Sequence, residues 1–133
     1  MPVLVQGWSR KTDGDVRLTA HFTVREFACR DGSDPVLIAP ALPHILEAIR
    51  AHFGGRPLLI SSGYRTPAHN KTVGGSARSQ HCLGTATDVR IRGIPPAEVA
   101  AFARELMPDF GGVGVYSTFT HIDVRTVKTD WKG

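Results

Sequence analysis

An amphipathic repeat between Pro40 and Phe53 constrains the fold more than any other segment. Apolar residues recur there at intervals of three and four positions, at Leu42, Ile45, Leu46, Ile49 and Phe53. This spacing predicts a helix with one apolar face, and two glycines, Gly54 and Gly55, end the repeat. The apolar face needs a partner, and 133 residues are the size of one compact domain. We therefore expect residues 1–133 to share a single core.

Short apolar runs, alternating patterns and a second apolar stripe, separated by glycine and proline, predict the other regular elements. Strands are expected at residues 57–62, 86–91, 111–116 and 120–125, and a second helix at residues 96–107. The last two strands are close enough in sequence to pair as a hairpin. Strands are few and helices flank them, so the predicted class is α+β, a small antiparallel sheet with flanking helices.

The remaining segments predict little regular structure. Thr23 followed by Glu26 is a capping-box pattern, typical of a short helical turn. Residues 63–76 are expected to form a loop, and residues 1–20 an irregular lead-in or a short hairpin. The tail is expected to dock back on the domain through Trp131.

The charge pattern argues against a nucleic-acid partner. The net charge is +4, but the 16 lysines and arginines are spread along the chain rather than gathered in one patch. Residues 1–8 lack the basic and apolar regions of a signal peptide, and no segment is suited to span a bilayer. We expect a protein made in the cytoplasm, with no transmembrane segment. No heptad seam or apolar stripe is evident, so we also expect a monomer.

The two cysteines do not form a metal knuckle or a redox motif by themselves. Cys29 and Cys82 are far apart in sequence, and no Cys-x-x-Cys pair is present. A disulfide between them is possible, but free, buried thiols are the preferred interpretation. Cys82 directly follows His81, so on an extended segment its side chain would point to the opposite face.

Three residues form a chemically suitable set of zinc ligands. His81, Asp88 and His121 offer two imidazole nitrogens and a carboxylate oxygen, which leaves a fourth position for water, as in catalytic zinc sites. Zinc lowers the pKa of bound water toward 7 and polarises carbonyl groups. The spacing of His81 and Asp88 alone is weak evidence for a site. Small residues between them, including Gly84, would let a loop and strand approach an ion closely.

Three ordered motifs resemble the M15 family of zinc peptidases. They are Ser-Gly-Tyr-Arg-Thr-Pro-x-His-Asn at 62–70, Ser-x-His-x-x-Gly-x-Ala-x-Asp at 79–88 and Phe-x-His-x-Asp-x-Arg at 119–125. The most similar branch is the D-Ala-D-Ala carboxypeptidase type with its phage-encoded members, which the segment 22–32 also resembles. The resemblance implies a hedgehog/DD-peptidase-like fold and zinc bound by His81, Asp88 and His121. It also implies that Arg65 binds a substrate carboxylate, for which a guanidinium fork is suited.

The general base of the best-known M15 members has no counterpart in this sequence. Those members carry an acidic residue three positions before the last histidine ligand, where this chain has Thr118. Asp123 is the nearest substitute, because on a strand it would share a face with His121. Asp123 could equally orient that histidine. Tyr116 is considered for contact with the tetrahedral intermediate or for a place in the core.

Two further polar residues, Ser79 and His69, are candidates for places around the site. Ser79 is the preferred substrate contact of the two.

The resemblance implies hydrolysis of peptide bonds in the stem peptides or cross-links of bacterial peptidoglycan. Carboxypeptidase and endopeptidase action are both open. A second hypothesis is a non-catalytic zinc domain that binds cell-wall peptide or assembles into a phage particle, since a fold does not determine a function. Without a signal peptide, the protein would reach the cell wall by another route, such as phage-mediated lysis or carriage on a phage tail.

Overall fold

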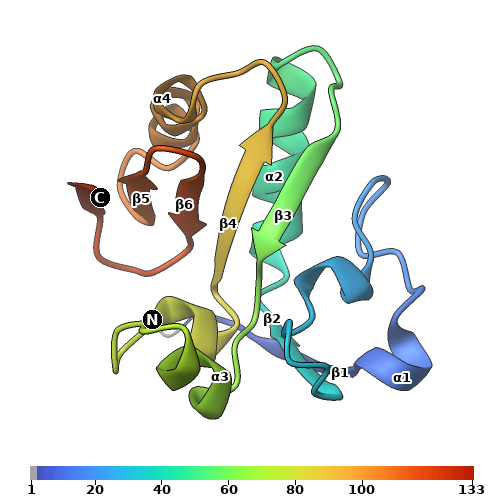
Figure 1. The fold of residues 1–133 in the computed structure, drawn as a ribbon. Helices are drawn as coiled ribbons and strands as arrows, with labels where there is room; N and C mark the ends of the chain where they lie inside the picture. The colour runs from blue at the N-terminus through green and yellow to red at the C-terminus, as the bar shows by residue number, and fades with distance from the viewer. Residues whose placement is uncertain (1–2) are drawn as a thin grey trace.

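The computed structural model describes residues 3–133, and it confirms the α+β class (Figure 1). The main sheet has five strands in the order β3-β4-β6-β5-β7. The strands are β3 (Leu58–Ser62), β4 (Ala86–Ile91), β5 (Gly112–Val115), β6 (Thr120–Asp123) and β7 (Thr129–Lys132). All neighbours are antiparallel except β5 and β7, so the predicted antiparallel sheet has one parallel pair at its edge. The predicted hairpin is β5–β6.

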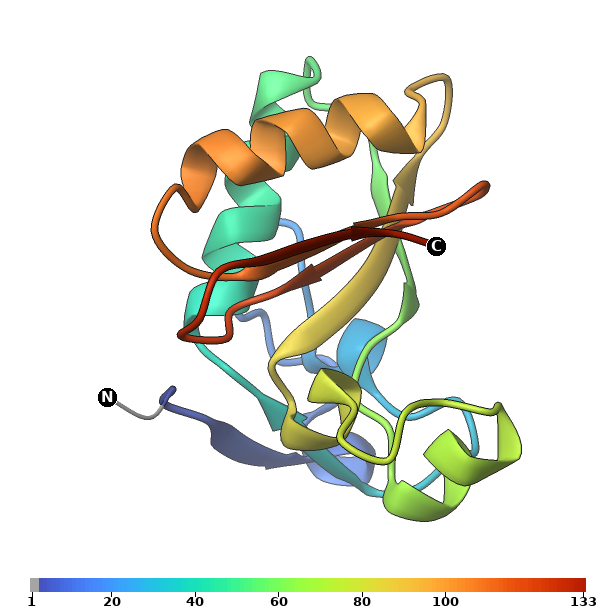
Figure 2. The ribbon, with the colours of Figure 1, turned by 90° about the vertical axis from the view of Figure 1, so that its left-hand side faces the viewer.

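Two helices cover the sheet and enclose the core. Helix α2 (Ala41–His52) is the predicted amphipathic helix, and α4 (Pro96–Leu106) is the second. Figure 2 shows α4 running along β5 and β6, which it contacts, while α2 packs against α4. The fully buried side chains between these layers include Leu46, Ile49, Val99, Val89 and Ile122. The apolar stripes identified in the sequence therefore face one another.

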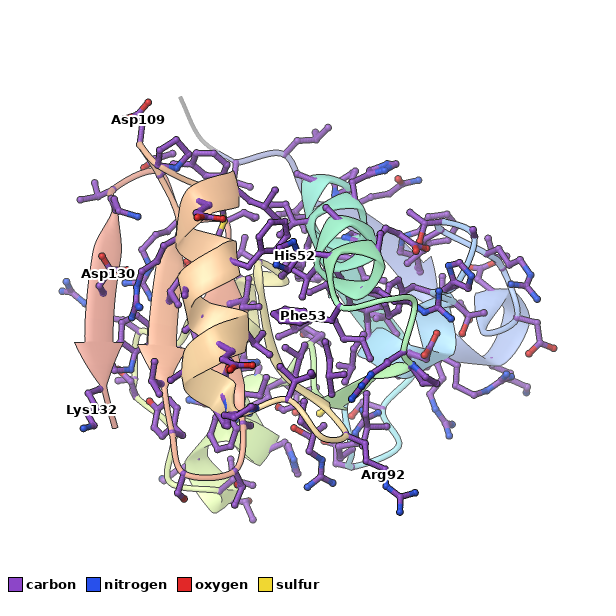
Figure 3. All side chains as sticks on the ribbon, turned by 90° about the horizontal axis from the view of Figure 1, so that it is seen from above. His52, Phe53, Arg92, Asp109, Asp130 and Lys132 are labelled. Atoms are coloured by element: carbon purple, nitrogen blue, oxygen red, sulfur yellow. The ribbon has the colours of Figure 1, made fainter. Side chains whose placement is uncertain are left out.

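The C-terminal end of α2 contacts the middle of α4 through aromatic rings. The His52 ring stacks on Phe102 with centroids 3.7 Å apart, and Phe53 meets Phe102 edge-on. In Figure 3, His52 and Phe53 lie between the two helices. On the far side, β7 forms the edge of the sheet and exposes Asp130 and Lys132.

The prediction of an irregular lead-in or a short hairpin over residues 1–20 was wrong for residues 6–13, which form a strand and a short helix. Strand β1 (Gln6–Ser9) pairs antiparallel with β2 (Pro35–Ile38), and the short helix α1 (Arg10–Asp13) follows with Ser9 as its N-cap. Sequence patterning missed β1 because its hydrogen-bonding partner lies far along the chain. The predicted capping box is present: the Glu26 carboxylate accepts a hydrogen bond from the Thr23 N–H at the 3₁₀ turn Val24–Phe27.

The loop predicted at residues 63–76 contains a helix, α3 (Pro67–Thr72). Thr66 caps it by accepting a hydrogen bond from the His69 N–H, and Pro67 occupies the first turn. Figure 1 places α3 near the point where β3 ends and β4 begins, away from α2 and α4. The segments 63–76 and 79–84, which carry much of the first two motifs, thus lie together at one end of the sheet.

Both cysteines are free, as preferred from the sequence, but their surroundings differ. Cys29 is buried, whereas Cys82 is only half-buried. His81 and Cys82 belong to a 3₁₀ turn, Gln80–Leu83, so the alternation of side chains expected on an extended segment does not apply to them. Among residues 3–133, no helix is long and apolar enough to cross a membrane.

Candidate active site

Strands β4 and β6 bring together the three side chains proposed as metal ligands. Asp88 of β4 and His121 of β6 are direct partners in the antiparallel register. The Asp88 Oδ1 atom lies 3.1 Å from Nδ1 of His121 and 3.3 Å from Nε2 of His81. All three side chains are buried. A set that is spread over 41 positions of the sequence therefore converges on one point.

His81 belongs to the 3₁₀ turn Gln80–Leu83, which places its side chain beside Asp88 and His121. The hydroxyl of Ser79 caps the turn by accepting a hydrogen bond from the His81 N–H. Gly84 ends the turn with φ +78°, and a Cβ there would lie 2.5 Å from the carbonyl oxygen of Leu37. Only glycine satisfies both the backbone conformation and this close approach. The chain then enters β4 in the register that presents Asp88.

Hydrogen bonds on the outer side of each imidazole set its orientation. His81 Nδ1 lies 2.7 Å from the carbonyl oxygen of Gly63, which can only accept, so this nitrogen carries the proton. His121 Nε2 lies 2.7 Å from Asp123 Oδ2. When each ring is neutral, its other nitrogen turns a lone pair toward Asp88. Three acceptors then face one another with no donor between them, an arrangement that a metal cation satisfies.

The electrostatics of the metal-free site are consistent with this interpretation. Burial alone would raise the pKa of Asp88, but hydrogen bonds from His121 and His81 outweigh burial and lower it to about 2. Burial would likewise lower the pKa of His121, yet its contacts with Asp123 and Asp88 raise it. The pocket thus favours positive charge at its centre, which is the charge that a bound cation provides.

Asp123 lies behind His121 rather than in the cleft. Its side chain has no exposed surface, and its oxygens accept hydrogen bonds from His121, from the Gly112 N–H and from the Arg125 guanidinium. Burial would raise its pKa, but these hydrogen bonds lower it, so it remains ionised. Of the two roles considered for Asp123, this placement favours orientation of His121.

The sequence pattern of the peptidase M15 family matches residues 18–123, a span that contains all three converging side chains. This chain belongs to the peptidase M15 family. M15 peptidases are metallopeptidases, in agreement with the donor set. The M15 chain is also 40% identical over 81 residues to the probable peptidoglycan L,D-endopeptidase MepK of Haemophilus influenzae. That alignment covers 56% of this chain and 42% of the relative, so the similarity spans less than half of the relative's length.

A cleft of this M15 peptidase is lined in part by His81, Asp88 and His121. It has a volume of about 570 Å³, and its lining includes Arg65, Ser79 and Tyr116, the three residues predicted to contact substrate. His69, also considered for the site, is not part of the lining. Thr118, at the position of the usual base, lines a different groove.

Arg65 is held over the site by three protein contacts. Its Nε donates to Ser62 Oγ at 3.2 Å, its Nη1 to Asn70 Oδ1 at 3.3 Å, and its Nη2 pairs with Asp88 Oδ2 at 3.5 Å. A guanidinium has five N–H donors, so at least two of them stay available for a ligand. Arg65 therefore both supports a member of the donor set and offers donors to the cleft of the M15 peptidase.

Trp131 contributes to the active site of the M15 peptidase, which the sequence did not predict. Its Nε1–H donates to the Tyr116 hydroxyl at 2.9 Å, and its ring lies 4.9 Å from that of His121. Tyr116 in turn stacks on Phe119 at 4.4 Å. The parallel pairing of β7 with β5 places Trp131 opposite Gly114, where a Cβ would lie 2.4 Å from the indole. Docking of the tail was predicted, but no local signal connected it with the cleft.

Proposed function

We propose that this chain is a zinc-dependent peptidase that hydrolyses peptide bonds in bacterial peptidoglycan. The observation that carries the proposal is the convergence of His81, Asp88 and His121 with their lone pairs directed at one point beside an open cleft. Membership of the M15 family and the name of the Haemophilus relative support the reaction type and the substrate. That relative is an L,D-endopeptidase by name, which favours cleavage of a cross-link over removal of a terminal residue.

The proposed division of work follows from the contacts of each side chain. His81, Asp88 and His121 would hold the zinc ion, which when bound supplies Lewis acidity and lowers the pKa of water. Asp123 keeps the Nε2 proton on His121, so that Nδ1 stays available as a ligand.

Two residues of the lining would bind the substrate itself. Tyr116 already accepts a hydrogen bond from Trp131, so its own proton is free to be donated to the carbonyl oxygen under attack. Arg65 would bind a substrate carboxylate with its remaining donors.

The charge of the cleft suits an anionic peptide. Three arginines, Arg65, Arg78 and Arg125, belong to the lining, and among the described residues Asp88 is its one carboxylate. Peptides of the cell wall carry free carboxylates, which these guanidinium groups would attract and align. With Asp88 engaged by two histidines, the lining offers no second carboxylate as general base. The non-catalytic zinc domain therefore stays as the competing hypothesis.

The decisive experiment measures release of amino groups from purified peptidoglycan. Metal-replete protein is compared with chelator-treated protein, with His81→Ala, and with His44→Ala as a control at an exposed histidine outside the cleft. We expect release by the metal-replete protein and by His44→Ala alone, and mass spectrometry of the products then identifies the bond. A folded, zinc-loaded protein that releases nothing from several wall chemistries would instead support the binding or assembly role.

A further inference from the structure

A second group of metal-ligating side chains lies outside the cleft. Cys29, Asp31 and His69 each place one potential ligand atom within 4.8 Å of the others. Cys29 and Asp31 belong to the segment between the first 3₁₀ turn and β2, while His69 lies on α3. None of the three lines the cleft described above.

Backbone and side-chain contacts hold the sulfur and the carboxylate in place. Cys29 Sγ accepts a hydrogen bond from the Thr66 N–H at 3.5 Å. Asp31 Oδ2 accepts one from the Thr66 hydroxyl at 3.0 Å, and Asp31 Oδ1 accepts one from the Ser33 N–H at 2.8 Å. Hydrogen bonds from Ser33 are the main cause that lowers the pKa of Asp31, so this carboxylate is ionised at neutral pH. The cluster thus already contains a fixed anion beside a buried thiol.

The cap of helix α3 does not explain why the imidazole of His69 lies beside Cys29 and Asp31. The cap uses only the backbone N–H of His69, which donates to Thr66 Oγ1 at 3.2 Å. Within residues 3–133, no hydrogen bond involves the His69 ring, although the residue is half-buried next to Cys29 and Asp31. A helix cap alone accounts for Thr66 and Asp31. It does not account for a thiol and an unengaged imidazole gathered at the same place.

We propose that Cys29, Asp31 and His69 bind a second metal ion, of the zinc class. A thiolate, an imidazole nitrogen and a carboxylate oxygen form a borderline-soft donor set, which suits Zn²⁺ or Co²⁺ and not Ca²⁺ or Mg²⁺. Asp31 is exposed, so water can complete a four-coordinate shell. Binding through sulfur converts the Cys29 thiol to a thiolate and releases its proton to solvent.

A metal ion at Cys29, Asp31 and His69 would stabilise the loop that carries Arg65. Thr66, the residue after Arg65, contacts both Cys29 and Asp31, and Asn70 of α3 accepts a hydrogen bond from Arg65. A metal that joins α3 to the segment around Cys29 would therefore limit movement of the Arg65 guanidinium. This role does not depend on the peptidase activity proposed above.

Cobalt substitution separates the two sites, because the catalytic set has no sulfur ligand. A thiolate ligand produces sulfur-to-cobalt charge-transfer absorption in the near ultraviolet, whereas histidine and carboxylate ligands do not. We expect metal-free wild-type protein to bind two equivalents of Co²⁺ and to develop this absorption. The His81→Ala variant should bind one equivalent and keep the absorption. The Cys29→Ser variant should bind one equivalent and lose it.

Two further variants keep the test independent of folding defects at the buried Cys29. His69→Gln changes a half-buried side chain and should weaken cobalt binding at the thiolate site at least tenfold. Cys82→Ser removes the other free thiol and should leave the absorption unchanged. A folded wild-type protein that binds one equivalent with no thiolate absorption would overturn the proposal. So would absorption that disappears with Cys82 rather than with Cys29.

Discussion

The carboxylate of Asp123 accepts a hydrogen bond from Nε2 of His121 at 2.7 Å, and the two residues lie on the same face of β6. The same carboxylate pairs with Arg125 and accepts the Gly112 N–H, so it cannot turn toward the cleft without breaking these contacts. The hydrogen bond from His121 to Asp123 keeps the His121 proton on Nε2 and leaves Nδ1 facing Asp88.

Replacing Asp123 by Asn tests whether this contact orients the ligand or transfers a proton. We expect metal affinity to fall roughly 10- to 100-fold, the typical cost of losing such a supporting partner. At saturating zinc, turnover should return to within a few-fold of wild type. Chelator competition and turnover at full occupancy measure the two effects. A variant that binds zinc normally but turns over more than about a hundredfold slower would identify Asp123 as the base.

The hydrogen bond from Trp131 to Tyr116 predicts coupled effects on catalysis. Trp131→Phe keeps an aromatic ring but removes the N–H donor, and we expect kcat to fall up to about tenfold with little change in KM. In a Tyr116→Phe background, the same change at Trp131 should have almost no further effect. A double-mutant cycle, built from the kinetics of the two single variants and the double variant, measures the coupling. Effects that simply add would mean that Trp131 acts independently of Tyr116.

Arg65→Lys should reduce substrate binding more than the chemical step. A lysine keeps the charge but cannot reproduce the fork that contacts Ser62, Asn70 and Asp88. We expect kcat/KM to fall on the order of 10- to 100-fold, mainly through KM. Arg92→Lys, at an exposed arginine outside the cleft, is the matched control. A loss confined to kcat would argue against a carboxylate-binding role.

The lowered pKa of Asp88 predicts a pH-dependent stability of the metal-free protein. Its folded value of about 2 is below the ordinary 3.8, so the ionised carboxylate stabilises the fold above pH 3.8. That contribution is lost as pH falls through about 2. In chelator, Asp88→Asn should lower the free energy of unfolding by roughly 2 kcal/mol near pH 5 and by much less near pH 2. Urea denaturation at both pH values measures the difference, and equal losses would contradict the assignment.

Gly84 and Gly74 form a matched pair for testing the turn before β4. Both have positive φ, but a Cβ at Gly84 meets the Leu37 carbonyl, whereas none of the described atoms lies within 4 Å of one at Gly74. We expect Gly74→Ala to cost about 1 kcal/mol of stability from backbone strain alone, and Gly84→Ala roughly 3 kcal/mol or more. Chemical denaturation compares them. Similar losses at the two positions would show that the close approach to Leu37 matters little.

The elements that the sequence predicted correctly are those with a strong local pattern. Helices α2 and α4 follow from apolar spacing on one face, and β3, β4, β5 and β6 from short apolar runs or alternating patterns between glycines and prolines. Strands β1, β2 and β7 escaped prediction because each is defined by hydrogen bonds to a distant partner. Strands β1 and β2 pair with each other, and β7 pairs with β5. Helix α3 begins with a recognisable N-cap pattern, Thr66 followed by Pro67. It was not predicted because it is short and has a weak apolar face.

The sequence by itself determined the chemistry available to the site. Its motifs singled out His81, Asp88 and His121 as ligands and Arg65 as a substrate contact, because residue type and order within a motif are properties of the chain. The tertiary structure decided which nitrogen of each histidine faces Asp88. It also placed Asp123 behind His121 and Trp131 beside Tyr116, and gathered Cys29 with His69. These relationships depend on strand register and on the packing of distant segments, which local periodicity does not encode.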